Sequence, residues 1–132
     1  MDRLILDTTI LVTAERRRQV LDALIDDEDD LVVAAITAAE LLVGVELADG
    51  RRRQSRQRYV EAILASVPVE NYDLEVARAH ALLLALVRRS GRPRGAHDLL
   101  IAATALARSR IVVTTDQEGF SDLPGVLVRV PA

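Results

Sequence analysis

The sequence predicts an α/β fold with a mainly parallel central sheet, formed by one domain over residues 1–132. Short apolar runs, of the length of buried strands, alternate with longer segments in which apolar residues recur at helical spacing. No repeat or linker-like stretch divides the chain, and 132 residues is the usual size of one domain. Half of the residues are hydrophobic. That is enough for a core at this length, where folding buries about two-thirds of the chain's surface.

The first elements are a strand, a helix and a second strand. Residues 3–6 are an apolar run that ends at Asp7, as is typical of a buried parallel strand. The two threonines that follow can cap a helix that begins near Ile10 and continues in helical character through residues 16–25. The acidic residues 26–30 predict a solvated loop. The second strand is expected over 31–36.

Two helices and a short strand are expected next. A helix should run from Thr37 to about Ala48, because Asp49 and Gly50 are typical stop signals. The basic segment 51–58 leads into apolar residues at helical spacing. Residues 67–69 resemble a short strand, which the proline in the middle would confine to an edge of the sheet or to a strand start.

The rest of the chain continues the alternation. A long helix is expected over 73–90, ended by Gly91, and another over 98–108. The last two strands are expected over 111–115 and 126–130.

Composition excludes several kinds of chemistry. All 17 basic residues are arginines, so Schiff-base catalysis and a phosphate-binding loop lysine cannot occur. The absence of cysteine excludes disulfides, thiol nucleophiles and cysteine-ligated metals. No apolar run approaches the ~20 residues of a membrane span, and no signal peptide is evident, so we expect a cytoplasmic protein. The net charge of −3 disfavours coating of nucleic acid through bulk charge but allows a local binding patch.

Four acidic residues are placed to meet at one edge of the predicted sheet. Asp7 and Asp116 directly follow strands, and Glu40 lies in the first turn of the helix after the second strand. Asp98 opens the helix that precedes the strand before Asp116. Ligands of open α/β sheets bind beyond the carboxyl ends of the strands. The sequence therefore predicts an acidic site at that edge.

Each acid also has a structural interpretation of its own. Asp7 could cap the following helix, and Thr37 with Glu40 matches a capping box. Asp98 could be a first-turn acid favoured by the helix dipole, and Asp116 could form a turn. Four acids at one edge are harder to explain in this way than any single one.

The surroundings of Glu40 and Asp98 favour a bound cation. Both carboxylates are flanked by apolar residues, where unpaired charges are costly and neighbouring carboxylates repel one another. Mg²⁺ or Mn²⁺, which prefer oxygen ligands, would remove both problems. Small residues at Gly44, Ala102 and Ala105 would let the helices approach the sheet closely. Such a site suits hydrolysis of phosphodiesters by a metal-activated water.

A family resemblance extends along the whole chain. It rests on Phe120 and on four segments, at residues 4–9, 36–45, 97–105 and 112–116. With these segments the sequence resembles the PIN-domain ribonucleases, and most closely the VapC toxins of bacterial toxin–antitoxin pairs. The resemblance implies a three-layer α/β/α PIN domain. It also implies a Mg²⁺- or Mn²⁺-dependent endoribonuclease that acts on structured RNA such as tRNA or ribosomal RNA. The implied partners are a second copy in a homodimer and a VapB-like antitoxin.

By motif match, the resemblance assigns the catalytic and metal-binding roles to Asp7, Glu40, Asp98 and Asp116. Thr9 stands where serine or asparagine is usual in the family, and its hydroxyl could orient Asp7 or a metal-bound water.

Two departures from the family pattern affect the expected site. One additional residue lies between Asp116 and the following aromatic residue, which leaves open whether Asp116 or Glu118 completes the site. His97 is expected to be structural or to face the substrate rather than to bind the metal, because Mg²⁺ prefers oxygen.

Other basic residues are weaker candidates. Arg92 and Arg94, in the loop before Asp98, are expected near the substrate. The segment Arg51–Arg58 could be a solvated helix start or an RNA contact.

Two other functions remain open from the sequence. A phosphoacceptor receiver domain is also a small α/β domain with strand-end acids, but it needs a second acid beside Asp7 and a late lysine, which this chain lacks. A PIN-like binding scaffold without catalysis is the second, and cleavage of DNA in place of RNA is a variant of the nuclease hypothesis.

Overall fold

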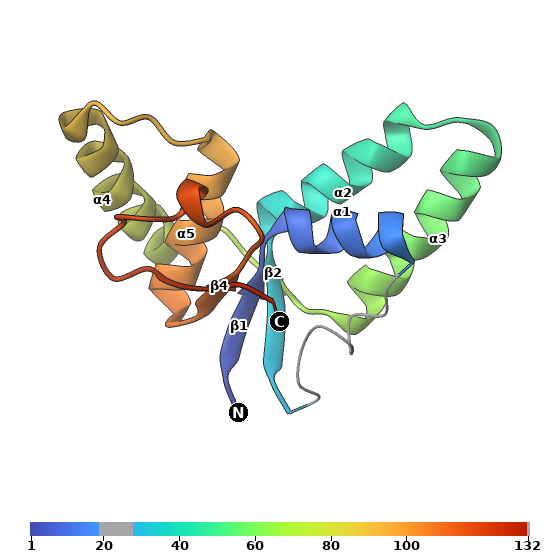
Figure 1. The fold of residues 1–132 in the computed structure, drawn as a ribbon, viewed down its shortest axis with the longest axis horizontal. Helices are drawn as coiled ribbons and strands as arrows, with labels where there is room; N and C mark the ends of the chain where they lie inside the picture. The colour runs from blue at the N-terminus through green and yellow to red at the C-terminus, as the bar shows by residue number, and fades with distance from the viewer. Residues whose placement is uncertain (19–27, 132) are drawn as a thin grey trace.

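The computed structural model describes residues 1–18 and 28–131, and its centre is a five-stranded sheet. The strand order is β3-β2-β1-β4-β5, and every pairing is parallel, as expected (Figure 1). The strands are β1 (Arg3–Leu6), β2 (Asp30–Ala34), β3 (Val69–Glu70), β4 (Ile111–Val113) and β5 (Leu127–Arg129). The strand predicted over residues 67–69 corresponds to β3, which begins directly after Pro68. It lies at a sheet edge, as predicted.

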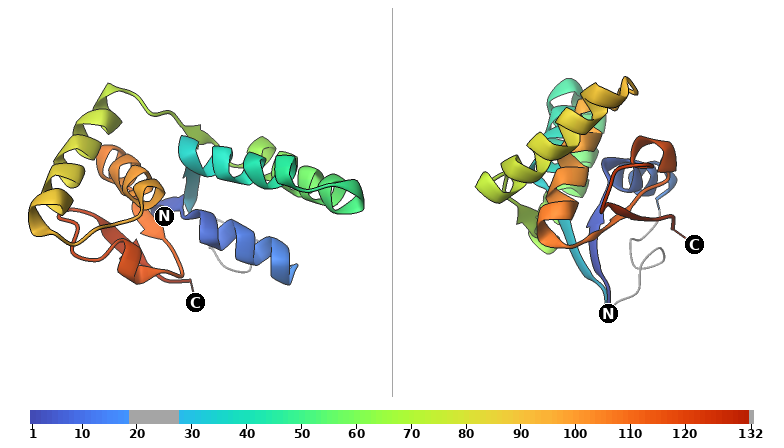
Figure 2. Two further views of the ribbon diagram at one scale, coloured as in Figure 1. Left: turned by 90° about the horizontal axis from the view of Figure 1, so that it is seen from above. Right: turned by 90° about the vertical axis from the view of Figure 1, so that its left-hand side faces the viewer.

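Helices cover both faces of this sheet. The α-helices of residues 1–18 and 28–131 are α1 (Thr8–Arg17), α2 (Ala35–Leu47), α3 (Gly50–Ser66), α4 (Leu74–Ser90) and α5 (Ala96–Arg108). Helices α4 and α5 pack on one face, while α1, α2 and α3 pack on the other (Figures 1 and 2). The expected three-layer α/β/α architecture is therefore confirmed. None of these helices combines the length and the apolar character that crossing a membrane would require.

The two helical layers share the sheet through alternation of its side chains. In β1, Ile5 packs toward the α4–α5 layer, where Phe120 is also fully buried. Its neighbours Leu4 and Leu6 point to the opposite face and pack with residues of α1, α2 and α3. Successive side chains of a strand alternate between faces, so an unbroken apolar run supplies two cores. Packing on both faces of the sheet fixes the carboxyl end of β1, where the acidic residues gather.

Several helix boundaries differ from those predicted. Helix α1 begins at Thr8, with Asp7 at its N-cap position, and ends at Arg17, where Arg18 adopts a left-handed conformation. The predicted helical stretch 16–25 is thus cut short, and residues 19–27 lie outside the described part of the chain. Helix α2 begins at Ala35 because the preceding strand already ends at Ala34.

One predicted packing detail is wrong. A side chain at Gly44 would meet the side chain of Arg56 on α3, so this glycine faces a neighbouring helix and not the sheet. The expectation for Ala102 and Ala105 is confirmed, since both are buried in the core beside the sheet.

Candidate active site

The four predicted acids lie at the carboxyl edge of the sheet, each on a different segment. Asp7 follows β1, and Glu40 lies in the second turn of α2. Asp98 lies in the first turn of α5, and Asp116 follows β4. Because β1 pairs in parallel with both β2 and β4, the segments that leave these three strands start side by side. The topology therefore places acids from distant parts of the chain at one edge.

Asp7 is buried and held by two hydroxyl groups. Its Oδ2 accepts hydrogen bonds from Oγ1 of Thr9 at 2.8 Å and from Oγ1 of Thr114 at 2.7 Å. Asp7 occupies the N-cap position of α1, as its helix-cap interpretation expects, but its side chain makes no capping hydrogen bond to the helix. Thr9 orients Asp7 as the resemblance implied. Thr114 was missed, because a threonine after a strand carries no distinguishing pattern in the sequence.

Glu40 is held from two sides. Its Oε1 accepts a hydrogen bond from Oγ1 of Thr8 at 2.7 Å, and its Oε2 lies 3.1 Å from Nδ1 of His97. Thr37, the expected cap, lies inside α2, and its hydroxyl pairs with that of Thr8 at 3.0 Å. The capping-box interpretation is therefore wrong. His97 was expected to be structural or to face the substrate. Its contact with the Glu40 carboxylate is in keeping with the structural role.

Asp98 and Asp116 meet at Gly119. A Cβ atom added to Gly119 would lie 2.7 Å from Oδ2 of Asp98 and 3.2 Å from Oδ2 of Asp116, so both carboxylates pack against this glycine. Asp116 also accepts a bond from the Gly119 amide, so its turn-forming role and its place in the site coexist. Partial burial and, after it, the negative charges of Asp7, Asp116 and Glu40 together raise the pKa of Asp98 to about 6, against a smaller opposite effect of His97.

The structure favours Asp116 over Glu118 as the fourth acid of the cluster. Asp116 is one of the charges that raise the pKa of Asp98, whereas Glu118 is not among them. The Asp116 backbone is also tied to the site, because its amide donates to Oγ1 of Thr114 at 2.9 Å. Glu118 lies in a one-turn 3-10 helix and is exposed.

A hollow of about 360 Å³ opens beside these carboxylates, and we call it the acidic hollow. Its lining residues are Asp7, Thr8, Thr9, Val12, Thr13, Arg16, Glu40, Asp98 and Thr115. Three of the four predicted acids line it, whereas Asp116 is not among the lining residues and lies with Asp98 against Gly119. Sequence reasoning gave no role here to Arg16, the one cation in this lining.

The donor atoms of the acidic hollow fit a hard divalent cation. The polar groups that line it are mainly carboxylates and hydroxyls, which would offer oxygen ligands, and Mg²⁺ and Mn²⁺ prefer oxygen ligands. Burial, and after it the repulsion of the neighbouring carboxylates, disfavours the charged form of Asp98, and a bound cation would offset both effects. Within the described residues, no three His, Cys, Asp or Glu side chains form a preformed cage. Mg²⁺ does not need one, since it usually binds one or two carboxylates and keeps several waters.

Arg92 and Arg94 lie outside the lining of the acidic hollow. Arg92 pairs with Asp122 at 3.3 Å, and Arg94 donates to the carbonyl oxygen of Ser121 at 2.7 Å. Both therefore fasten the loop before α5 to the segment after the 3-10 helix. Their contact with substrate stays a prediction.

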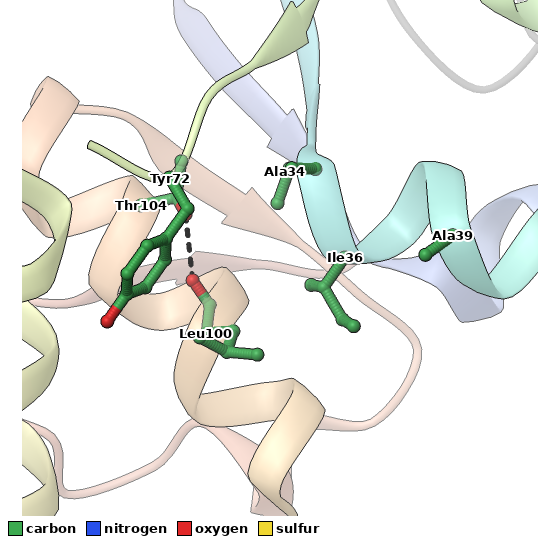
Figure 3. A pocket seen from close by; sticks show the side chains of 7 residues that line it. Ala34, Ile36, Ala39, Tyr72, Leu100 and Thr104 are labelled. Carbon is green, nitrogen blue, oxygen red and sulfur yellow. Dashed lines mark hydrogen bonds between the residues drawn. The ribbon is translucent and has the colours of Figure 1, made fainter.

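Another hollow is apolar and carries no chemistry. It is lined by Ala34, Ala35, Ile36, Ala39, Tyr72, Leu100 and Thr104 (Figure 3). The Thr104 hydroxyl donates to the carbonyl oxygen of Leu100 at 2.8 Å, which satisfies its donor (Figure 3). The acidic hollow is therefore the candidate active site.

Comparison with known proteins agrees with this geometry. The family model described as "PIN domain" matches residues 4–126. The chain belongs to the PIN-domain family. Receiver domains form a different family, so the phosphoacceptor alternative is wrong.

Several relatives of this PIN domain are named VapC. It is 37% identical to the VapC ribonuclease Y4jK of Sinorhizobium fredii, with 89% of each chain covered. It is 30% identical to the tRNA(fMet)-specific endonuclease VapC of Salmonella typhimurium, with 74% of this chain and 73% of the relative covered. Among solved structures, the VapBC-5 toxin–antitoxin system of Mycobacterium tuberculosis has a chain that matches with a TM-score of 0.78. That match has 31% identity and covers 98% of each chain.

Proposed function

We propose that this PIN domain is the toxin of a toxin–antitoxin pair and a metal-dependent endoribonuclease. The observation that carries the proposal is the gathering of Asp7, Glu40, Asp98 and Asp116 at one sheet edge beside a hollow. The absence of lysine and cysteine leaves no amine or thiol nucleophile, so hydrolysis by water is the chemistry these residues suit. The ribonuclease names of the relatives support the same activity.

In this proposal Asp7 and Asp98 are the principal ligands of a Mg²⁺ or Mn²⁺ ion, with Glu40 and Asp116 acting directly or through water. A bound ion would supply positive charge at the scissile phosphate and lower the pKa of a coordinated water. The hydroxyls of Thr9 and Thr114 keep the Asp7 carboxylate in one orientation. Thr8 and His97 do the same for Glu40. Substitution of groups that orient metal ligands in this way typically lowers metal affinity or activity about 10–100-fold.

The proposed substrate is structured RNA, with tRNA as the first to test. Support comes from the Salmonella relative, which is named for cleavage of tRNA(fMet). The proposed inhibitor is a VapB-like antitoxin, supported by the toxin–antitoxin assembly in which the Mycobacterium structure was solved. Ribosomal RNA and DNA are the alternative substrates that the same assay separates.

A homodimer and a cytoplasmic location complete the proposal. Helix α4 leaves Leu74 66% and Leu82 70% exposed, and association would remove this apolar surface from water. Light scattering on the purified protein should give the mass of two chains. A mass of one chain would reject the dimer without affecting the nuclease proposal.

The decisive experiment is cleavage of bulk tRNA, ribosomal RNA and single-stranded DNA by the purified chain. Activity should require Mg²⁺ or Mn²⁺, stop with EDTA and be lost in Asp7→Asn and Asp98→Asn. Glu118→Gln is the matched control, because Glu118 is an exposed acid beside the site, and it should retain activity. Undiminished cleavage by either aspartate variant would reject the assignment. No cleavage by the wild type, with no Mn²⁺ binding in a calorimetric titration, would favour the non-catalytic scaffold.

A further inference from the structure

A hollow of about 630 Å³ adjoins the acidic hollow, and five of its lining residues are arginines. We call it the arginine pocket. It lies between the last turns of α1 and the first turns of α3, and is lined by Val12, Glu15, Arg16, Arg18, Arg51, Arg52, Ser55 and Arg56. Val12 and Arg16 also line the acidic hollow, so the two share a wall along α1.

The described part of the chain supplies little negative charge to this pocket. Its one acid, Glu15, lies 3.4 Å from Nε of Arg56, and Arg56 also donates to the carbonyl oxygen of Gly44 at 3.4 Å. Arg56 therefore serves to join α3 to α1 and α2. The other four arginines are exposed, and none forms an ion pair with another described residue: Arg16, Arg18, Arg51 and Arg52.

Local folding does not explain the arginines of α3. Cations near a helix C-terminus, such as Arg16 on α1, are favoured by the helix dipole. Arg51 and Arg52 lie in the first turn of α3, where the dipole disfavours them, and no acid shares that turn. Like charges placed together also repel one another. These side chains therefore weaken the local structure, and binding of an anion would offset that cost.

We infer that the arginine pocket binds backbone phosphates of the RNA strand that is cleaved in the acidic hollow. This inference rests on the proposed function. An acidic site repels RNA, so cations close to it are needed for binding, and the shared Arg16 places them along one continuous path. At a rise of ~1.5 Å per residue, the nine residues from Asp7 to Arg16 span about 13 Å, which places the pocket at phosphates beyond the scissile one. Guanidinium groups suit this role because they bind phosphate oxygens in pairs.

The test compares two double variants in their binding of end-labelled bulk tRNA. One is Arg51→Ala/Arg52→Ala. The matched control is Arg88→Ala/Arg89→Ala, an exposed arginine pair in the last turn of α4, on the other face of the sheet. Binding is measured by anisotropy in EDTA, which prevents cleavage, over a series of salt concentrations. We expect the first variant to bind on the order of tenfold more weakly and its salt dependence to fall by about one to two phosphate contacts. The control should remain within about twofold of the wild type, and Arg51→Lys/Arg52→Lys should recover part of the binding.

The outcomes separate this inference from the proposed function. Asp98→Asn should keep tRNA binding and lose cleavage. If the wild type cleaves RNA but Arg51→Ala/Arg52→Ala binds it unchanged, the arginine pocket is not an RNA site and the nuclease proposal stands. Equal losses in the two double variants would mean diffuse charge attraction and would overturn the inference. So would unchanged RNA binding with loss of antitoxin binding, which would assign the pocket to an acidic segment of the protein partner.

Discussion

Oγ1 of Thr114 lies 2.7 Å from Oδ2 of Asp7, although 107 residues separate the two in the chain. The same hydroxyl accepts a hydrogen bond from the Asp116 amide at 2.9 Å. One buried threonine therefore connects two acids of the site and ties the end of β4 to the end of β1.

Thr114→Val should loosen both acids with little change in volume. Losing a buried hydrogen bond to a carboxylate and stranding the Asp116 amide should lower the free energy of unfolding by about 1–3 kcal/mol. RNA cleavage should fall about 10–100-fold, as for other groups that orient metal ligands. Urea unfolding and initial rates test this against Thr115→Val, whose exposed hydroxyl makes only a 3.3 Å contact with Thr9. Equal effects of the two substitutions would contradict a special role for Thr114.

Asp98→Asn should stabilise the metal-free protein at neutral and higher pH. The pKa of Asp98 is raised from 3.8 to about 6 in the folded chain. Between these values the unfolded chain binds fewer protons than the folded one, so stability falls as pH rises through this window. After allowance for solvent screening at this partly exposed group, the gain on substitution should be on the order of 1 kcal/mol at about pH 8. It should vanish below about pH 4. Denaturation in EDTA at several pH values provides the measurement, and a pH-independent effect would refute the charge explanation.

Binding of Mn²⁺ should strengthen as pH rises through 6. Metal and proton compete for Asp98, so affinity should increase about tenfold per pH unit below its pKa and level off above it. Calorimetric titration from acid to neutral pH would show this. Asp116→Asn should weaken binding, whereas Glu118→Gln should not. The reverse order of these two variants would transfer the fourth position of the site to Glu118.

Gly119→Ala should displace the carboxylates without unfolding the protein. The added methyl group would lie 2.7 Å from Oδ2 of Asp98, and the short side chain can move aside. We expect a fall in cleavage of about 10–100-fold, since small misplacements of reacting groups are costly. Gly95→Ala is the graded control, because its Cβ would lie 3.4 Å from the same atom. If both alanine variants cleaved RNA as fast as the wild type, the site would tolerate the displacement and the prediction would be wrong.

The acids of the site could be predicted from the sequence because they follow from parallel topology. Asp7 and Asp116 each follow an apolar run, and the carboxyl ends of parallel strands share an edge. The capping-box interpretation of Glu40 fails for a physical reason. Helix α2 starts directly after β2, so Thr37 falls inside the helix and bonds across to Thr8.

The groups that could not be predicted depend on contacts between distant segments. The role of Thr114 exists only because β4 inserts beside β1. The place of Arg16 between two hollows depends on α3 folding back beside α1, which no local pattern records. Gly44 likewise lies against the side chain of Arg56, and this contact depends on how α2 and α3 pack together.

The strand order has a consequence for the synthesis of this protein. Within this domain strand β4 is made long after β1, yet the two strands pair side by side. A growing chain that stops short of Thr114 has neither Asp116 nor the hydroxyl that, together with that of Thr9, holds Asp7. The four acids therefore cannot gather on a nascent chain until almost all of the domain has emerged.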